Sequence, residues 1–175
     1  ILPMINGNDL VAQAQSGTGK TGTFCISALQ IVDDFKKPQI IIISPTHELA
    51  DQSYNVAKSL GSFMPNINVN KVIGGTSKRQ SYEEIKKGGG QIIVGTPGRI
   101  IDMIRSKLLP VDAIKLLIID EADEMLTLGF EDDLKSIIKS IPETSQITLF
   151  SATLSEAAID ITNEFLQNSM HILVK

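Results

Sequence analysis

The chain has 175 residues, 42% of them hydrophobic and 21% charged, with a formal net charge of −4. This size and balance predict one globular domain with a substantial core. No run of 18 apolar residues occurs, which excludes a membrane-spanning helix, and the single cysteine excludes an intrachain disulfide and favours a reducing compartment. The chain opens on "ILPMINGND", without an initiator Met or a signal-peptide pattern, so we expect it to be a fragment of a longer protein.

The charges are unevenly distributed along the chain. Residues 71–107 carry eight basic and three acidic residues, a net charge of +5, which leaves −9 for the remainder. A basic segment in an acidic protein is compatible with binding to a polyanion, and equally with ordinary solvated helix faces. Charge alone therefore does not assign a ligand.

Short apolar runs alternate with helical patterns along the chain. Several runs are continuous Ile, Leu or Val, which is typical of strands covered on both faces. We predict strands at residues 9–14, 39–44, 67–73, 91–95, 115–120, 146–151 and 171–174. We predict helices at about 19–33, 48–60, 78–87, 98–107, 131–140 and 155–166. This alternation predicts an α/β fold with a parallel sheet of about seven strands and helices on both faces.

In such a fold ligands bind at the carboxyl ends of the strands, so the residues after each apolar run are the candidate site. The first of these segments is "AQSGTGKT", whose two glycines allow a tight turn with backbone N–H groups directed at a phosphate chain. Lys20 adds a positive charge for the outer phosphates, and the hydroxyl of Thr21 suits a magnesium ion. The segment is a variant P-loop because the usual pattern begins with Gly, and a chance Gly-rich turn is the alternative. The predicted nucleotide-binding residues are Ala14, Gln15, Ser16, Gly17, Thr18, Gly19, Lys20 and Thr21.

Four carboxylates in five residues follow the apolar run "LLII": Asp120, Glu121, Asp123 and Glu124. A P-loop needs an acidic residue at the end of a neighbouring strand to hold Mg²⁺, and Asp120 is placed for that role. Glu121 is placed to orient and polarise an attacking water. Acidic residues at a helix start also interact with the helix dipole without any ligand, but beside a P-loop the metal interpretation is favoured.

Six motifs occur in one order along the chain: "AQSGTGKT", "PTHELA" at 45–50, "GG" at 74–75, "TPGR" at 96–99, "DEAD" at 120–123 and "SAT" at 151–153. Together they resemble the DEAD-box ATP-dependent RNA helicases, most closely the translation initiation factor 4A group. The resemblance implies a single RecA-like ATP-binding domain over residues 1–175, with ATP and Mg²⁺ as cofactors.

The resemblance also implies a role for each motif residue. Lys20, Asp120 and Glu121 would be catalytic, and Thr21 and Asp120 would hold the metal. Asp123, Ser151 and Thr153 would couple hydrolysis to RNA handling through hydrogen bonds between them. The implied RNA-binding residues are Pro45, Thr46, His47, Gly75, Thr96, Arg99 and Asp102.

Backbone N–H groups and hydroxyls at helix starts can hold phosphates without reading bases. Simple helix caps are the local alternatives: Thr153 or Ser155 would cap the helix after "SAT", and Thr96 followed by Pro97 would begin the helix of "TPGR". A helix start can serve both purposes.

Three departures from the family pattern stand out. His47 replaces the usual Arg of the second motif, which removes a fixed positive charge from the RNA side. The adenine-recognising Q motif is represented at most by its tail, "ILP", and the second RecA-like domain is absent. A metal role for His47 or His171 is not favoured, and we predict that Cys25 is a core residue.

The resemblance implies an RNA-dependent ATPase that couples hydrolysis to local duplex unwinding, in translation initiation. The implied partners are RNA, contacted through its backbone without sequence preference, the second RecA-like domain of the same chain, and translation initiation factors. No membrane contact is implied, and the expected location is the cytoplasm, with the nucleus as the alternative. The competing interpretations are an ATP-gated RNA clamp or scaffold and a P-loop ATPase that acts on protein or DNA.

Overall fold

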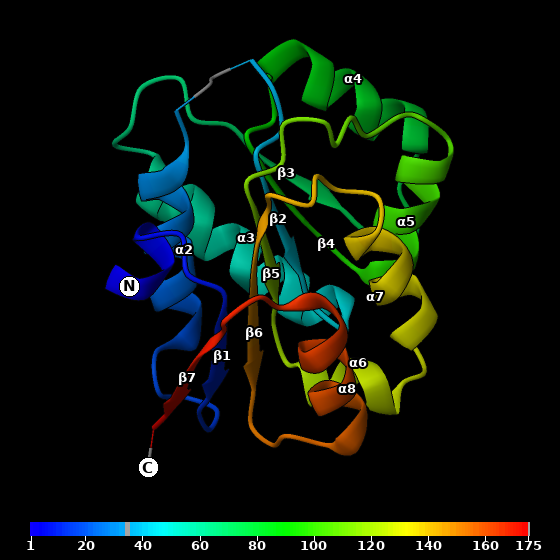
Figure 1. Cartoon of the computed structure of the whole chain (residues 1–175). Coiled ribbons are helices and arrows are strands. Elements are labelled where there is room, and N and C mark those ends of the chain that lie inside the picture. The colour runs from blue at the N-terminus through cyan, green and yellow to red at the C-terminus, as the bar shows by residue number, and fades with distance from the viewer. Residues whose placement is uncertain (34–35, 175) are drawn as a thin grey trace.

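The structure is a computed structural model that describes residues 1–33 and 36–174, and Figure 1 shows the whole chain. The strands are β1 (Leu10–Gln13), β2 (Ile40–Ile43), β3 (Val69–Val72), β4 (Ile92–Gly95), β5 (Leu116–Ile119), β6 (Gln146–Ser151) and β7 (Met170–Leu173). The helices are α1 (Leu2–Ile5), α2 (Lys20–Ile31), α3 (His47–Gly61), α4 (Lys78–Gly88), α5 (Pro97–Arg105), α6 (Ala122–Thr127), α7 (Glu131–Ile138) and α8 (Glu156–Phe165).

The strands form one parallel sheet in the order β3-β4-β2-β5-β6-β1-β7. The predicted α/β architecture and the seven predicted strands are therefore confirmed. The two central strands, β2 and β5, are buried along their whole length, as expected for strands that are apolar on both sides.

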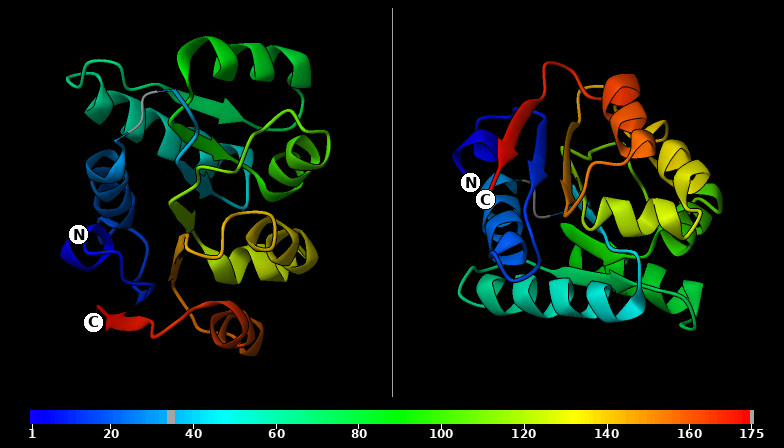
Figure 2. Two further views of the ribbon diagram at one scale, coloured as in Figure 1. Left: turned by 45° about the horizontal axis from the view of Figure 1, so that its top comes forward. Right: turned by 90° about the horizontal axis from the view of Figure 1, so that it is seen from below.

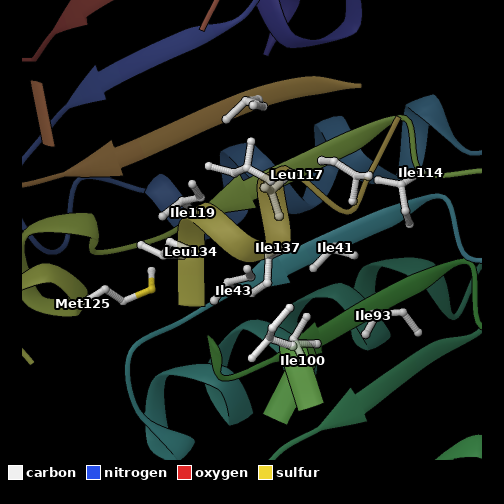
Figure 3. Packing of buried hydrophobic residues seen from close by; sticks show 14 of the residues in the cluster. Ile41, Ile43, Ile93, Ile100, Ile114, Leu117, Ile119, Met125, Leu134 and Ile137 are labelled. Atoms are coloured by element: carbon white, nitrogen blue, oxygen red, sulfur yellow. The ribbon is translucent and has the colours of Figure 1, made fainter. Parts of the chain in front are cut away.

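Successive residues of each strand point to opposite faces, so one apolar run serves two cores. Ile41 and Ile43 pack in a cluster with buried residues of α4 to α8, whereas Ile40 and Ile42 pack with residues of α1, α2 and α3. The two helical layers lie on opposite sides of the sheet in Figure 2. Figure 3 shows the first cluster, in which Ile137 of α7 lies among strand residues. Each buried Ile or Leu contributes about 1.5–3 kcal/mol, so the sheet is a stable base for the loops at its carboxyl edge.

The helical patterns missed two short helices, α1 and α6. They have four and six residues, too few for a repeating apolar stripe to be recognised. The helix predicted at about 131–140 is α7, which buries Leu134, Ile137 and Ile138 and ends at Ile138 rather than at residue 140. Cys25 is fully buried, and no helix within the described residues is long and apolar enough to cross a membrane.

Candidate functional site

The strand order divides the carboxyl edge of the sheet into two regions. Strands β5, β6 and β1 are neighbours, so the loops after them bring the P-loop, the acidic run and the "SAT" segment together. We call this region the P-loop half. Strands β3, β4 and β2 are also neighbours, and their loops bring together the predicted RNA-binding residues. We call this region the Arg99 half.

The P-loop turns sharply between β1 and α2. Gly17 and Gly19 have φ values of 81° and 92°, in the left-handed region that residues with a Cβ rarely adopt. Gln15 through Gly19 are exposed, and the Thr18 hydroxyl donates to the carbonyl of Gln15 at 2.8 Å. An exposed turn at the start of a twelve-residue helix matches the predicted phosphate-binding geometry.

Lys20 links the P-loop to the acidic run. Its side chain is buried, its Nζ donates to the carbonyl oxygen of Ala14 at 2.9 Å, and it forms an ion pair with Oε1 of Glu121 at 3.0 Å. The predicted outer-phosphate cation and the predicted water-positioning carboxylate are therefore in direct contact.

Asp120 is the deepest carboxylate of the site, with 4% of its surface exposed. Burial raises the pKa of Asp120 to about 7, and the negative charge of Glu121 adds to this effect while Lys20 opposes it. A buried carboxyl that resists ionisation would be stabilised as an anion by a nearby cation. Its Oδ1 accepts from the backbone N–H of Glu121 at 3.1 Å.

Among residues 1–33 and 36–174 no cluster of three or more His, Cys, Asp and Glu could hold a metal ion. A magnesium site at Asp120 would therefore depend on the Thr21 hydroxyl, on water and on nucleotide phosphates. Mg²⁺ is usually held in this way, through one or two carboxylates and substrate phosphates. The residues present fit such a metal.

Glu121 occupies an unusual backbone conformation. Its φ of 50° and ψ of 53° are left-handed, which costs about 1–2 kcal/mol for a residue with a Cβ. This residue lies between the end of β5 and the start of α6, with its carboxylate on Lys20. Glu124, by contrast, is exposed, as expected for a carboxylate with a solvated role.

Asp123 joins the acidic run to the "SAT" segment. Its Oδ2 accepts from the hydroxyl of Thr153 at 2.8 Å and from the Thr153 backbone N–H at 3.0 Å. Partial burial acts to raise the pKa of Asp123, but the hydrogen bonds, led by the Thr153 hydroxyl, outweigh it and lower the pKa. The Ser151 hydroxyl accepts from the Asp123 backbone N–H at 3.2 Å, and hydrogen bonding by Ser151 also contributes to the lowered pKa of Asp123. The hydrogen bonds expected between these three residues are therefore present.

The Arg99 half begins with the segment before α3. Pro45 is buried, and the Thr46 hydroxyl caps α3 by accepting from the Leu49 backbone N–H at 3.3 Å. His47 is exposed, and its ring lies against Gly74, because a Cβ placed on Gly74 would come within 3.1 Å of the ring Nε2. The "PTHELA" and "GG" motifs thus meet at His47 and Gly74.

The rest of the Arg99 half lies at the start of α5 and the turn before α4. Thr96 precedes α5 and Pro97 begins it, as predicted, but the buried Thr96 side chain makes no cap hydrogen bond. In the P-loop half, the corresponding helix start is capped: Ser155 rather than Thr153 caps α8, by accepting from the Ala158 backbone N–H at 3.3 Å. Gly75 is exposed, with a φ of 82°.

Two residues of this region, Thr76 and Lys78, were not predicted as site residues, and each is in contact with one that was. Arg99 Nη1 donates to the carbonyl oxygen of Thr76 at 2.8 Å, and Asp102 Oδ1 pairs with Nζ of Lys78 at 3.0 Å. In the sequence, the one signal for Lys78 is that it belongs to the basic segment 71–107. No local pattern distinguishes the backbone carbonyl of Thr76 from any other.

Comparison with known proteins identifies the family. Residues 1–161 match the DEAD/DEAH box helicase family. The chain belongs to this family. Two similar relatives, each described as "ATP-dependent RNA helicase eIF4A", are from Yarrowia lipolytica and Debaryomyces hansenii, with 51% and 48% identity over the whole chain. The chain spans 44% of the length of each of these relatives.

Solved structures agree with this assignment. A DEAD box protein from the hyperthermophile Methanococcus jannaschii superposes with a TM-score of 0.88 at 34% identity, covering 99% of this chain and 47% of that one. S. cerevisiae Dbp5 carrying L327V, bound to Nup159, Gle1 H337R, IP6 and ADP, gives a TM-score of 0.85 at 34% identity, with coverages of 95% and 44%. The predicted family and RecA-like fold of this DEAD/DEAH box domain are confirmed.

Proposed function

We propose that this chain is the ATP-binding domain of an ATP-dependent RNA helicase that couples hydrolysis to local RNA unwinding in translation initiation. The observation that carries the proposal is the Lys20–Glu121 contact at 3.0 Å, which joins the P-loop to the acidic run. Relatives described as ATP-dependent RNA helicase eIF4A match the chain from end to end and support the same function.

In this proposal the phosphates of ATP bind at the P-loop. The backbone N–H groups of the turn around Gly17 and Gly19, with the amino end of α2, provide a positive surface for them. Lys20 then exchanges Glu121 for the outer phosphates. Glu121 is released to accept a hydrogen bond from the attacking water and to orient it.

Magnesium would be held by Asp120 and the Thr21 hydroxyl together with phosphates. When bound, it neutralises charge on the transferred phosphate group. Asp120 is suited to this because its carboxyl is buried and its pKa is raised to about 7, so a bound cation would favour its ionised form near neutral pH.

Asp123 would transmit the state of the nucleotide site to β6 and α8. It follows the catalytic carboxylates in the chain and is bonded through both its backbone and its carboxylate to the "SAT" segment. A shift of Glu121 on nucleotide binding would move this segment with it.

The Arg99 half would bind the RNA backbone. Helix starts, exposed backbone at Gly75 and the side chains of His47 and Arg99 lie along the edge formed by β2, β4 and β3. Such groups contact phosphates rather than base edges, so the expected binding is independent of sequence and weakened by salt. The implied partners are RNA, a second RecA-like domain and translation initiation factors, in the cytoplasm.

The test is RNA-stimulated ATP hydrolysis together with duplex unwinding by the full-length protein. We expect both activities, and we expect both to be lost in Lys20→Ala. Stimulated hydrolysis without unwinding would instead identify an ATP-gated clamp. Hydrolysis that responds to DNA or protein but not to RNA would contradict the proposal.

A further inference from the structure

The turn between β3 and α4, residues 73–77, is held from two sides; we call it the glycine loop. On one side the His47 ring lies against Gly74. On the other side α5 contacts the carbonyl oxygen of Thr76 in the loop and the side chain of Lys78, the first residue of α4. The contacts of α5 come from Arg99 and Asp102.

These two contacts are made by one face of α5. Arg99 and Asp102 are three residues apart on α5, so they lie on the same face of the helix. They reach positions 76 and 78, on either side of the cap residue Ser77. One hydrogen bond and one ion pair therefore connect α5 to the end of the glycine loop and the start of α4.

Asp102 is the acidic member of the implied RNA-binding set. A carboxylate repels phosphates, and the structure shows this one paired with Lys78 at 3.0 Å, each side chain a little under half exposed. The pair cancels both charges locally. Lys78 is accordingly paired rather than a free cation, and its partner Asp102 is fixed beside the loop.

We propose that Lys78 and Asp102 are positioning residues for RNA binding, whose ion pair holds the glycine loop against α5 in the geometry that contacts phosphates. This inference rests on the proposed function of the Arg99 half. Because the pair is exposed, its effect is modest: we expect a two- to fivefold change in RNA affinity, roughly the range of exposed ion pairs.

The experiment measures RNA affinity across a salt series for the full-length protein and five variants. We expect Lys78→Gln and Asp102→Asn each to weaken binding two- to fivefold, and the double variant to be no weaker than the weaker single variant. The exchange Lys78→Asp with Asp102→Lys should recover most of the affinity, because it rebuilds the ion pair. It also places a negative charge at the amino end of α4 and a positive charge toward the carboxyl end of α5, and both placements are favourable for the helix dipole. Lys87→Gln is the matched control, since it removes the same charge from the far end of α4 and should leave affinity within about 1.5-fold, well below the effect of breaking an exposed ion pair.

Three outcomes would overturn the inference. Equal losses from Lys78→Gln in the wild-type and Asp102→Asn backgrounds, with the salt slope reduced by about one, would identify Lys78 as a direct phosphate contact. Tighter binding by Asp102→Asn would show simple repulsion by the carboxylate. Equal losses from Lys78→Gln and Lys87→Gln would show a general effect of charge.

Amide hydrogen exchange without RNA separates this inference from the proposed function. Lys78→Gln should accelerate exchange at residues 74–78 and leave α5 unchanged, and this holds whether or not the protein binds RNA. Unaltered exchange in the glycine loop would contradict the positioning role. Loss of RNA binding in the wild-type protein would instead contradict the proposed function.

Discussion

The two halves of the carboxyl edge use charge in opposite ways. In the P-loop half, Lys20 and Asp120 are at least nine-tenths buried and Glu121 is mostly so. In the Arg99 half, the charged groups of Lys78 and Asp102 are each more than 40% exposed. Charges removed from water interact strongly and shift each other's ionisation, whereas exposed charges are screened. This contrast fits the proposed roles, in which the first half acts on one defined ligand and the second binds a polyanion through many weak contacts.

The largest expected effect tests the buried half. Glu121→Gln should retain binding of ATP and Mg²⁺ while hydrolysis falls by about 10²–10⁴-fold, because the amide keeps the shape of the carboxylate but cannot act as a base. The measurement is nucleotide affinity with and without Mg²⁺, alongside RNA-stimulated turnover. Glu124→Gln is the matched control, since the same change at an exposed carboxylate should alter little. Equal damage from both variants would refute the assignment of roles along this strand end.

An intermediate effect concerns the buried carboxyl of Asp120. Its pKa in the folded state, about 7, is above the ordinary value of 3.8, so between these values the native protein binds more protons than the unfolded chain. Stability should therefore fall as pH rises from about 4 to 7 and change little with this group above that range. Asp120→Asn should remove this loss and raise the free energy of unfolding at pH 8 by about 1–3 kcal/mol without Mg²⁺.

Urea unfolding of the wild-type and Asp120→Asn proteins at pH 5 and pH 8 provides the measurement. The Asp120→Asn variant should also lose Mg²⁺-dependent nucleotide binding. The control Asp132→Asn makes the same change at an exposed carboxylate and should keep that binding. If the wild-type and Asp120→Asn proteins respond identically to pH, the pKa of Asp120 is not raised in the folded protein.

The smallest effect tests the exposed half. His47→Arg in the full-length protein should tighten RNA binding by up to about tenfold at low salt and add about one unit of salt slope, without any sequence preference. His47→Gln is the control for ring size and hydrogen bonding without a fixed charge. An affinity for RNA that is the same in wild type and His47→Arg across the salt series would place residue 47 away from the RNA.

Much of the site could be predicted because its informative features are local. The glycines at 17 and 19, the lysine after them and the carboxylates after β5 are each defined by neighbours in the chain. Short apolar runs likewise predicted the seven strands, and the continuous runs predicted strands covered on both faces, because backbone geometry and burial follow from a few adjacent residues. The short helices α1 and α6 were missed because so few residues carry no periodicity.

What only the tertiary structure decided is which strand ends are neighbours. The order β3-β4-β2-β5-β6-β1-β7 places Lys20 on Glu121, Thr153 on Asp123 and Lys78 on Asp102. These partners are separated by 24 to 101 residues, and no local pattern specifies them. Pairing at that distance depends on how the sheet assembles and on which face each helix covers. The sequence by itself thus determined the chemical groups of each loop, and the strand order determined the partner that each group meets.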